Sequence, residues 1–245
     1  MRYRFSLAAT LTMIAALAAT TAFAAKPAPE ITELQGQTLE SVQVGPPRTG
    51  QATCQLGVTG AAAFNINYLL PPNDEYFTLI DPASCGCANG AVQLNNINIA
   101  LQFPVACTQP VQISVVGASG DAACYFPNPA SVICQPVNYN LAPGAAGSFL
   151  FTMALAPGCC VSGPVFIRVS FVSGGVGCNT SATIPRLITT AACVPCTSYN
   201  IYPGGNDELC DVGFPGNPIM FSDADCCGAT PTKLGSWGGL KINYR

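Results

Sequence analysis

Apolar residues recur at every second position in six separate runs of this sequence. A spacing of two places alternate side chains on one face of an extended strand, so the pattern predicts half-buried β-strands rather than helices. The apolar members of the runs are Phe64, Ile66 and Tyr68; Ile97, Ile99, Leu101 and Phe103; Val111, Ile113 and Val115; Val137, Tyr139 and Leu141; Phe149, Phe151, Met153 and Leu155; and Val165, Ile167, Val169 and Phe171.

Turn-forming residues separate these runs, as at Pro143 and Gly144 and at Pro157 and Gly158. Short strands between frequent turns, without helical periodicity, are typical of antiparallel sandwiches and barrels. The sequence therefore predicts an all-β, disulfide-rich antiparallel β-sandwich, either jelly-roll or immunoglobulin-like. Further strands are expected around Phe77 to Ile80, Val92 to Leu94, Pro218 to Phe221 and at the C-terminus.

The N-terminus has the three parts of an export signal. Arg2 and Arg4 precede an apolar run, and the residues Ala22 to Ala24 form a small-residue cleavage site. We predict a signal peptide over residues 1–24 and a secreted or cell-surface protein with no transmembrane segment after cleavage. An uncleaved membrane anchor is the alternative, because the apolar stretch approaches the about 20 residues that span a bilayer.

The rest of the chain divides by composition. Residues 25–53 contain four prolines and no cysteine, which predicts a linker or loosely ordered N-terminal arm with at most a turn of helix near Ile31 to Leu34. Residues 54–245 are expected to form the β-sandwich domain, with cysteine-pinned loops after Arg186. A separate second domain in that last region is the alternative, although it would have a thin core of its own.

The chain contains fourteen cysteines and no histidine. An even number of cysteines behind an export signal predicts structural disulfides, with zinc ligation as the alternative. Neighbouring cysteines are expected to join different partners, because a bridge between adjacent residues is strained. One local pair, Cys124 with Cys134, is predicted. The predicted disulfide cysteines are Cys54, Cys85, Cys87, Cys107, Cys124, Cys134, Cys159, Cys160, Cys178, Cys193, Cys196, Cys210, Cys226 and Cys227.

The absence of histidine removes the usual nucleophile and general-base systems, so no enzyme activity and no catalytic residue are expected. A pair of carboxylates, as in glycoside hydrolases, is the distant alternative, with Asp81, Asp121, Asp223 and Asp225 as candidates. Nine basic residues stand against twelve acidic ones, for a net charge of −3. Because the basic residues are scattered, nucleic acid is excluded as a partner.

Acidic residues gather toward the C-terminus. Asp207, Glu208, Asp211, Asp223 and Asp225 carry the oxygen ligands that calcium prefers, so calcium is a candidate cofactor, although their spacing matches no calcium-loop signature.

Three aromatic residues are candidate ligand-binding positions. Tyr199, Tyr202 and Trp237 are proposed because exposed aromatic rings can stack on sugars.

Two segments resemble parts of known protein families. The tail from Ser236 to Arg245 resembles short Trp-Gly tails of uncharacterised exported proteins of environmental bacteria, and the segment Gly213 to Ile219, before Asp223 to Cys227, resembles the closing strand of jelly-roll modules in bacterial surface and carbohydrate-binding proteins. The resemblance implies a non-catalytic module that binds an extracellular glycan or protein. A structural envelope or filament subunit is the alternative; exposed aromatic rings would favour sugar binding, whereas an exposed apolar edge strand would favour assembly.

Overall fold

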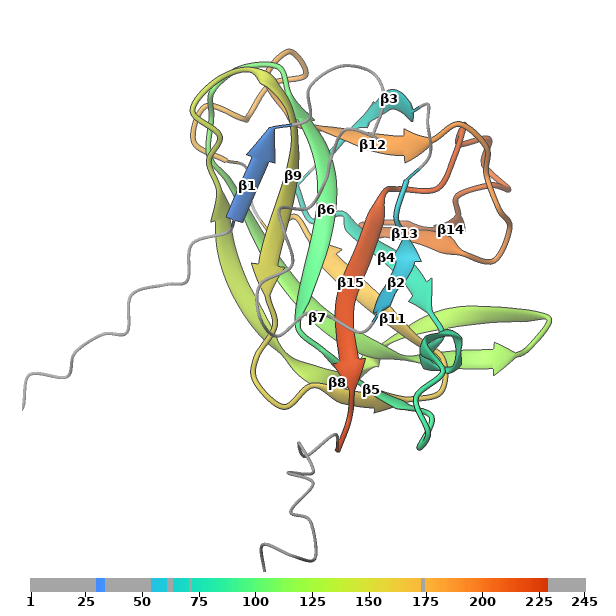
Figure 1. Cartoon of the computed structure of the whole chain (residues 1–245). Helices are drawn as coiled ribbons and strands as arrows, with labels where there is room; N and C mark the ends of the chain where they lie inside the picture. The colour runs from blue at the N-terminus through green and yellow to red at the C-terminus, as the bar shows by residue number, and fades with distance from the viewer. Residues whose placement is uncertain (1–29, 34–53, 61–63, 71, 173–174, 229–245) are drawn as a thin grey trace, which may run out of the picture.

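Two antiparallel β-sheets packed together form the body of the protein (Figure 1). The computed structural model describes residues 30–33, 54–60, 64–70, 72–172 and 175–228. Within these ranges the regular structure consists of strands and one short 3-10 helix, η2 (Pro82–Cys85). None of the described segments forms a helix long and apolar enough to cross a membrane. The predicted all-β, disulfide-rich antiparallel sandwich is therefore confirmed.

The larger sheet has nine strands, and its main path runs β1-β9-β6-β15-β5-β10. Strand β2 pairs with β15, β12 pairs with β6 and with β3, and the pairings are antiparallel. The bounds are β1 (Glu30–Glu33), β2 (Cys54–Val58), β3 (Phe64–Leu69), β5 (Ala91–Leu94), β6 (Asn96–Phe103), β9 (Gly147–Ala154), β10 (Cys160–Ser162), β12 (Arg186–Thr190) and β15 (Met220–Cys226).

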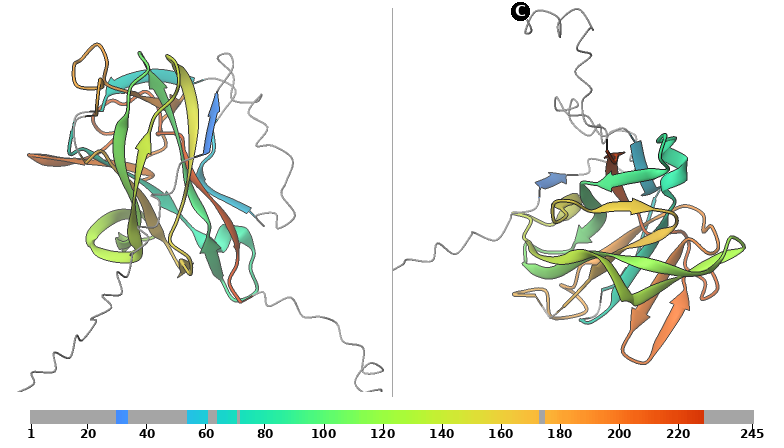
Figure 2. Two further views of the ribbon diagram at one scale, coloured as in Figure 1. Left: turned by 90° about the vertical axis from the view of Figure 1, so that its left-hand side faces the viewer. Right: turned by 90° about the horizontal axis from the view of Figure 1, so that it is seen from below.

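The smaller sheet has six strands in the order β14-β13-β4-β11-β7-β8. Its long β7–β8 hairpin extends beyond the sandwich at the right of Figure 1 and again in the right-hand view of Figure 2. The bounds are β4 (Glu75–Ile80), β7 (Gln109–Asp121), β8 (Cys124–Leu141), β11 (Val165–Ser170), β13 (Ser198–Tyr202) and β14 (Gly205–Glu208).

The alternating apolar residues form the core between the sheets. On β6, Ile97, Ile99, Leu101 and Phe103 are fully buried, and the alternating apolar residues predicted on β7, β9 and β11 belong to the same cluster. Burying one such side chain contributes about 1.5–3 kcal/mol, so the alternation fixes which face of each strand turns inward. All six predicted runs fall on strands of the structure.

Two predictions about local structure are wrong. The turn of helix expected near Ile31 is instead strand β1, which pairs with β9. β-Branched residues such as Ile31 and Thr32 favour an extended chain, and pairing with β9 satisfies its backbone groups.

The second wrong prediction concerns the region after Arg186, where cysteine-pinned loops were expected and the structure also has strands. Strands β12, β13 and β14 precede β15, and Pro203 and Gly204 form the two-residue connection between β13 and β14. Gly204 adopts φ 124°, a conformation that favours glycine, so these turn residues end one strand and begin another. The signal peptide at 1–24, Trp237 and the C-terminal strand lie outside the described residues.

All fourteen cysteines pair, and no free cysteine remains. As predicted, the adjacent cysteines join different partners rather than each other. The bridges are Cys54–Cys85, Cys87–Cys226, Cys107–Cys178, Cys124–Cys196, Cys134–Cys159, Cys160–Cys227 and Cys193–Cys210.

The predicted pair of Cys124 with Cys134 is wrong. Both residues lie on β8, which runs through the expected proline loop without turning back. The register places Cys124 opposite Asp121 and Cys134 opposite Val115, six residues apart along β7. At about 3.3 Å per residue this is roughly 20 Å, far beyond the about 7 Å that a bridge allows between Cα atoms. Cys124 instead meets Cys196 at a Cα separation of 5.2 Å, and Cys134 meets Cys159 at 5.4 Å.

Candidate functional site

Polar side chains form a continuous row across four strands of the nine-stranded sheet. Strands β2, β15, β6 and β9 lie side by side at the front of Figure 1. The register sets Gln55 opposite Asp223 and Asn98 opposite Thr152. The alternate residues of these strands point into the core, so this row lies on the outer face of the sheet. We refer to Gln55, Asn96, Asn98, Thr152 and Asp223 as the amide row.

Asp223 is the centre of the amide row. Its Oδ1 accepts a hydrogen bond from Gln55 Nε2 at 2.8 Å, and its Oδ2 accepts from Asn96 Nδ2 at 2.9 Å and Asn98 Nδ2 at 3.1 Å. Its backbone N–H donates to Asn96 Oδ1 at 3.0 Å. Both carboxylate oxygens are thus held by amide donors from two neighbouring strands.

Asn98 extends the row toward β9. Its Nδ2 also donates to Asn96 Oδ1 at 2.9 Å, and its Oδ1 accepts from the Thr152 hydroxyl at 2.6 Å. Asn98 is 2 % exposed, so these bonds satisfy an amide that would otherwise be buried without partners. Asn98 therefore holds the row in position rather than presenting it.

A β-bulge aims the asparagines at the acids of β15. Ala224 lies opposite Leu94, but Phe221 lies opposite Asn98, so the β5–β6 side has one extra residue at Asn95 and Asn96. Asn95 Nδ2 donates to Asp225 Oδ2 at 2.8 Å while Asn96 reaches Asp223. The bulge thus turns two consecutive side chains toward β15.

Part of the amide row is accessible to a ligand. Within the row Gln55 is exposed, and Asn96, Thr152 and Asp223 are half-buried; Asn95, beside the row, is also exposed. Amides both donate and accept hydrogen bonds, and a carboxylate accepts them. The face can therefore form hydrogen bonds with a polar, uncharged ligand.

The other two candidate acids of the hydrolase hypothesis shape turns. Asp81 Oδ1 accepts from the N–H of Ala83 at 3.0 Å and so caps η2. Asp121 Oδ1 accepts from the N–H of Ala123 at 2.9 Å in the β7–β8 turn. Only Asp223 and Asp225 share a strand and a face.

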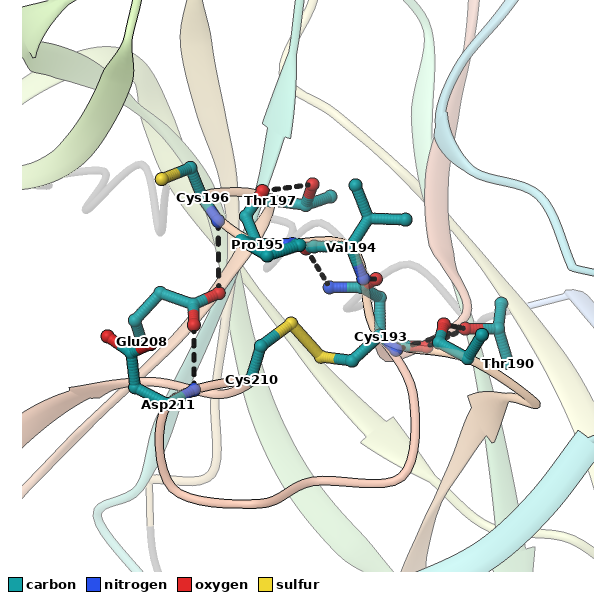
Figure 3. Close-up of a disulfide and its surroundings, with 11 residues drawn as sticks. Thr190, Cys193, Val194, Pro195, Cys196, Thr197, Glu208, Cys210 and Asp211 are labelled. Carbon is teal, nitrogen blue, oxygen red and sulfur yellow. Dashed lines mark hydrogen bonds between the residues drawn. A yellow bond between two sulfur atoms is a disulfide. The ribbon is translucent and has the colours of Figure 1, made fainter.

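Glu208 fixes the loops around two disulfides (Figure 3). Its Oε1 accepts from the N–H of Cys196 at 3.2 Å, and its Oε2 accepts from the N–H of Asp211 at 2.9 Å. Cys196 has φ 59°, which a residue with a side chain rarely adopts, and its sulfur is bonded to Cys124. Glu208 and the bridge together hold this backbone in place.

The five predicted calcium ligands do not form one site. Asp207, Glu208 and Asp211 lie on or just after β14, in the six-stranded sheet, whereas Asp223 and Asp225 lie on β15 in the other sheet. Among the residues that the structure describes, no group of three or more histidines, cysteines or acids could hold a metal ion. Tertiary structure separates acids that are close in the sequence.

Tyr199 does not present a ring for stacking. It is 4 % exposed, and its ring packs against Phe126 and Phe166, with centroids 5.6 Å away in each case. Its hydroxyl donates to the carbonyl of Tyr125 at 2.7 Å. Burial, followed by the negative charges of Glu208 and Asp211, raises the pKa of this phenol to about 12. Tyr199 is a core residue beneath the β7–β8 hairpin.

Tyr202 is half-buried and hydrogen-bonded. Its hydroxyl donates to Asp207 Oδ2 at 2.9 Å, and that bond with the Asp207 charge raises the pKa of the phenol. The tyrosine lies opposite Gly205 in the β13–β14 hairpin, where a Cβ atom on residue 205 would lie 2.7 Å from the Tyr202 hydroxyl. The ring therefore covers a glycine of its own hairpin.

Comparison with known proteins gives one match. No curated protein and no solved structure matched the chain. A family model described as a domain of unknown function, DUF7451, matches residues 53–224. That range begins just before β2 and includes every residue of the amide row. Because the match covers more than half of the sequence, the chain belongs to the DUF7451 family.

Proposed function

We propose that the protein is a non-catalytic, secreted or cell-surface module that binds an extracellular glycan through the amide row. The observation that carries the proposal is the unbroken set of hydrogen bonds from Gln55 on β2 through Asp223 and Asn98 to Thr152 on β9. Side chains held in this way lose little conformational freedom when a ligand arrives, which favours binding.

The chemistry of the row matches a carbohydrate. Sugar hydroxyls donate and accept hydrogen bonds; the amides of the row can do both, and the carboxylate accepts. Phe221, which the register places opposite Asn98, is 4 % exposed. Recognition on this face would accordingly use hydrogen bonds more than ring stacking, in a module of the jelly-roll, carbohydrate-binding kind that the sequence resembles.

A binding role fits the carboxylates better than hydrolysis. Asp225 accepts a hydrogen bond from the amide of Asn95. Asp223 accepts from three side-chain amides, one of glutamine and two of asparagine. A glycosidase needs one carboxyl group that gives up a proton to the leaving group and one that acts on the sugar. Amide donors arranged around an acid suit a fixed acceptor rather than a proton donor.

A glycan array with the oxidised protein, followed by calorimetry on the best ligand, tests the proposal. We expect Gln55→Ala and Asp223→Asn to weaken binding about tenfold or more, since a hydrogen bond to a charged group contributes about 1.5–3 kcal/mol. Asp211→Asn is the matched control, because it removes an equal charge from the other sheet and should leave the affinity unchanged. Absence of any bound glycan, or equal binding by all three variants, would contradict the proposal.

A further inference from the structure

A second row of polar side chains crosses the outer face of the nine-stranded sheet, on strands β12, β6 and β9. The register sets Arg186 opposite Gln102, and Gln102 opposite Ser148. The adjacent residues Leu187, Leu101 and Phe149 belong to the core, so alternation turns the three polar side chains to the outer face, which also carries the amide row. We refer to Arg186, Gln102 and Ser148 as the arginine row.

Arg186 has no counter-ion in the part of the chain that the structure describes. Its cross-strand neighbours, Leu69 on β3 and Gln102 on β6, are uncharged, and its guanidinium forms neither a hydrogen bond nor an ion pair with a described residue. Arg168, the other arginine of the described ranges, differs: its Nη1 lies 3.7 Å from Glu75 Oε1, and its Nε donates to Ser114 Oγ at 2.8 Å. The positive charge of Arg186 is thus left without a partner.

Partial burial makes this unpaired charge costly. Arg186 and Gln102 are half-buried, and Arg186 Nε and Gln102 Oε1 are covered without a hydrogen-bond partner among the described residues. The Nη groups of Arg186 and Nε2 of Gln102 are not covered in this way, so these N–H groups face the solvent. A bound anion would accept hydrogen bonds from them and would offset the cost of the unpaired charge.

We propose that the arginine row binds an acidic group, a carboxylate or a sulfate, carried by the glycan. The inference rests on the proposed function, because it assumes that the ligand of the amide row is a glycan. A planar guanidinium matches the geometry of such oxyanions and can donate two parallel hydrogen bonds to them. The Gln102 amide and the Ser148 hydroxyl supply further donors, and the row contains no acid that would repel the ligand.

The spacing of the two rows fits one extended glycan. Gln102 and Asn98 are four residues apart on β6, which is roughly 13 Å along the strand. The buried apolar residues Ala100 and Leu150 lie between the rows, so the polar contacts are confined to the rows themselves. This separation exceeds the screening length of about 8 Å at physiological ionic strength, so the charge of Asp223 repels an acidic group at Arg186 only weakly.

A glycan array that pairs carboxylated and sulfated glycans with their carboxyl-reduced and desulfated counterparts tests the proposal, followed by calorimetry on the best pair. We expect the acidic member to bind about tenfold or more tightly than the neutral one, and high salt to reduce the difference. Arg186→Gln should remove the preference and leave binding of the neutral member unchanged, which also shows that the variant is folded. Gln55→Ala should weaken both members equally, because it changes only the amide row.

Gln102→Glu provides a second variant that keeps the size of the side chain. The new carboxylate lies directly opposite Arg186 and should pair with it, so this variant should also lose the preference for the acidic member. Gln135→Glu is the matched control: Gln135 is exposed on β8 in the other sheet, so the same added charge there should leave the preference intact.

The outcomes separate this inference from the proposed function. Equal binding of both members by the wild type, or a preference that Arg186→Gln and Gln102→Glu both retain, would overturn the arginine row and leave the amide row standing. A preference that Arg186→Gln removes, with no effect of Gln55→Ala or Asp223→Asn on either member, would support the arginine row and contradict the amide row. A protein that binds no glycan on the array would contradict both.

Discussion

Glu208 shows how one side chain can stabilise an uncommon backbone conformation. It accepts hydrogen bonds from the backbone of Cys196, at φ 59°, and of Asp211. We expect Glu208→Gln to lower the free energy of unfolding by about 1–3 kcal/mol, because one accepting oxygen becomes a donor facing a donor. Urea unfolding measures the change. Asp211→Asn removes the same charge nearby and should have a much smaller effect; an equal loss in both variants would show that net charge is responsible.

Tyr199 should make stability depend on pH in the alkaline range. Burial and nearby acids raise the pKa of its phenol from 10.0 to about 12, so the folded state favours the protonated form. The contribution is complete below pH 10 and is lost as the pH rises through about 12.

Comparison with Tyr199→Phe checks this dependence. The stability of the variant should fall less steeply than that of the wild type between pH 10 and about 12, and its phenolate absorbance should lack one late-ionising group. Tyr125, which lies on β8 and contacts the same cluster, provides the control through Tyr125→Phe. Identical titration curves for the wild type and Tyr199→Phe would contradict the assignment.

At the scale of the strands, predictability follows amphipathicity. Strands β6, β7, β9 and β11 were predicted because each places apolar residues on a face that becomes fully buried. Strands β12 to β14 are short, the last of them contains only glycine and polar residues, and turn residues such as Pro195, Pro203 and Gly204 lie between them. Only pairing with neighbouring strands makes such segments extended.

The candidate site was predictable in part. Asp223 and Asp225 stand out as charges in a chain with few of them, but Gln55 lies 168 residues from Asp223 and no local pattern connects the two. The outward orientation of Asn98 could have been predicted, because it lies between the core residues Ile97 and Ile99 and side chains alternate between the two faces of a strand. Which polar residues it would meet depended on the strand order and on the bulge at Asn95.

At the scale of the whole molecule, the disulfides connect segments that are far apart in the sequence. Cys87 and Cys226 are 139 residues apart, and Cys107 and Cys178 are 71 apart. Spacing could predict that such bridges exist but not which cysteines they join, because the fold brings the partners together. Two bridges, Cys54–Cys85 and Cys87–Cys226, connect η2 and the segment just after it to β2 and β15. A third, Cys160–Cys227, connects β10 to the residue that follows β15.

The magnitude of the disulfide contribution predicts what reduction will do. Each bridge typically contributes about 2–4 kcal/mol, and the lower end of that range over seven bridges is comparable with the whole net stability of a domain, about 5–15 kcal/mol. We therefore expect complete reduction at neutral pH to unfold the protein, although its apolar core is extensive. Thiol titration in denaturant should find no free thiol before reduction and fourteen after it, and circular dichroism should lose the β-sheet signal as the thiols appear. The oxidised chain kept under identical conditions is the control. A fully reduced and alkylated protein that still unfolds cooperatively at the same urea concentration would show that the core alone stabilises the fold.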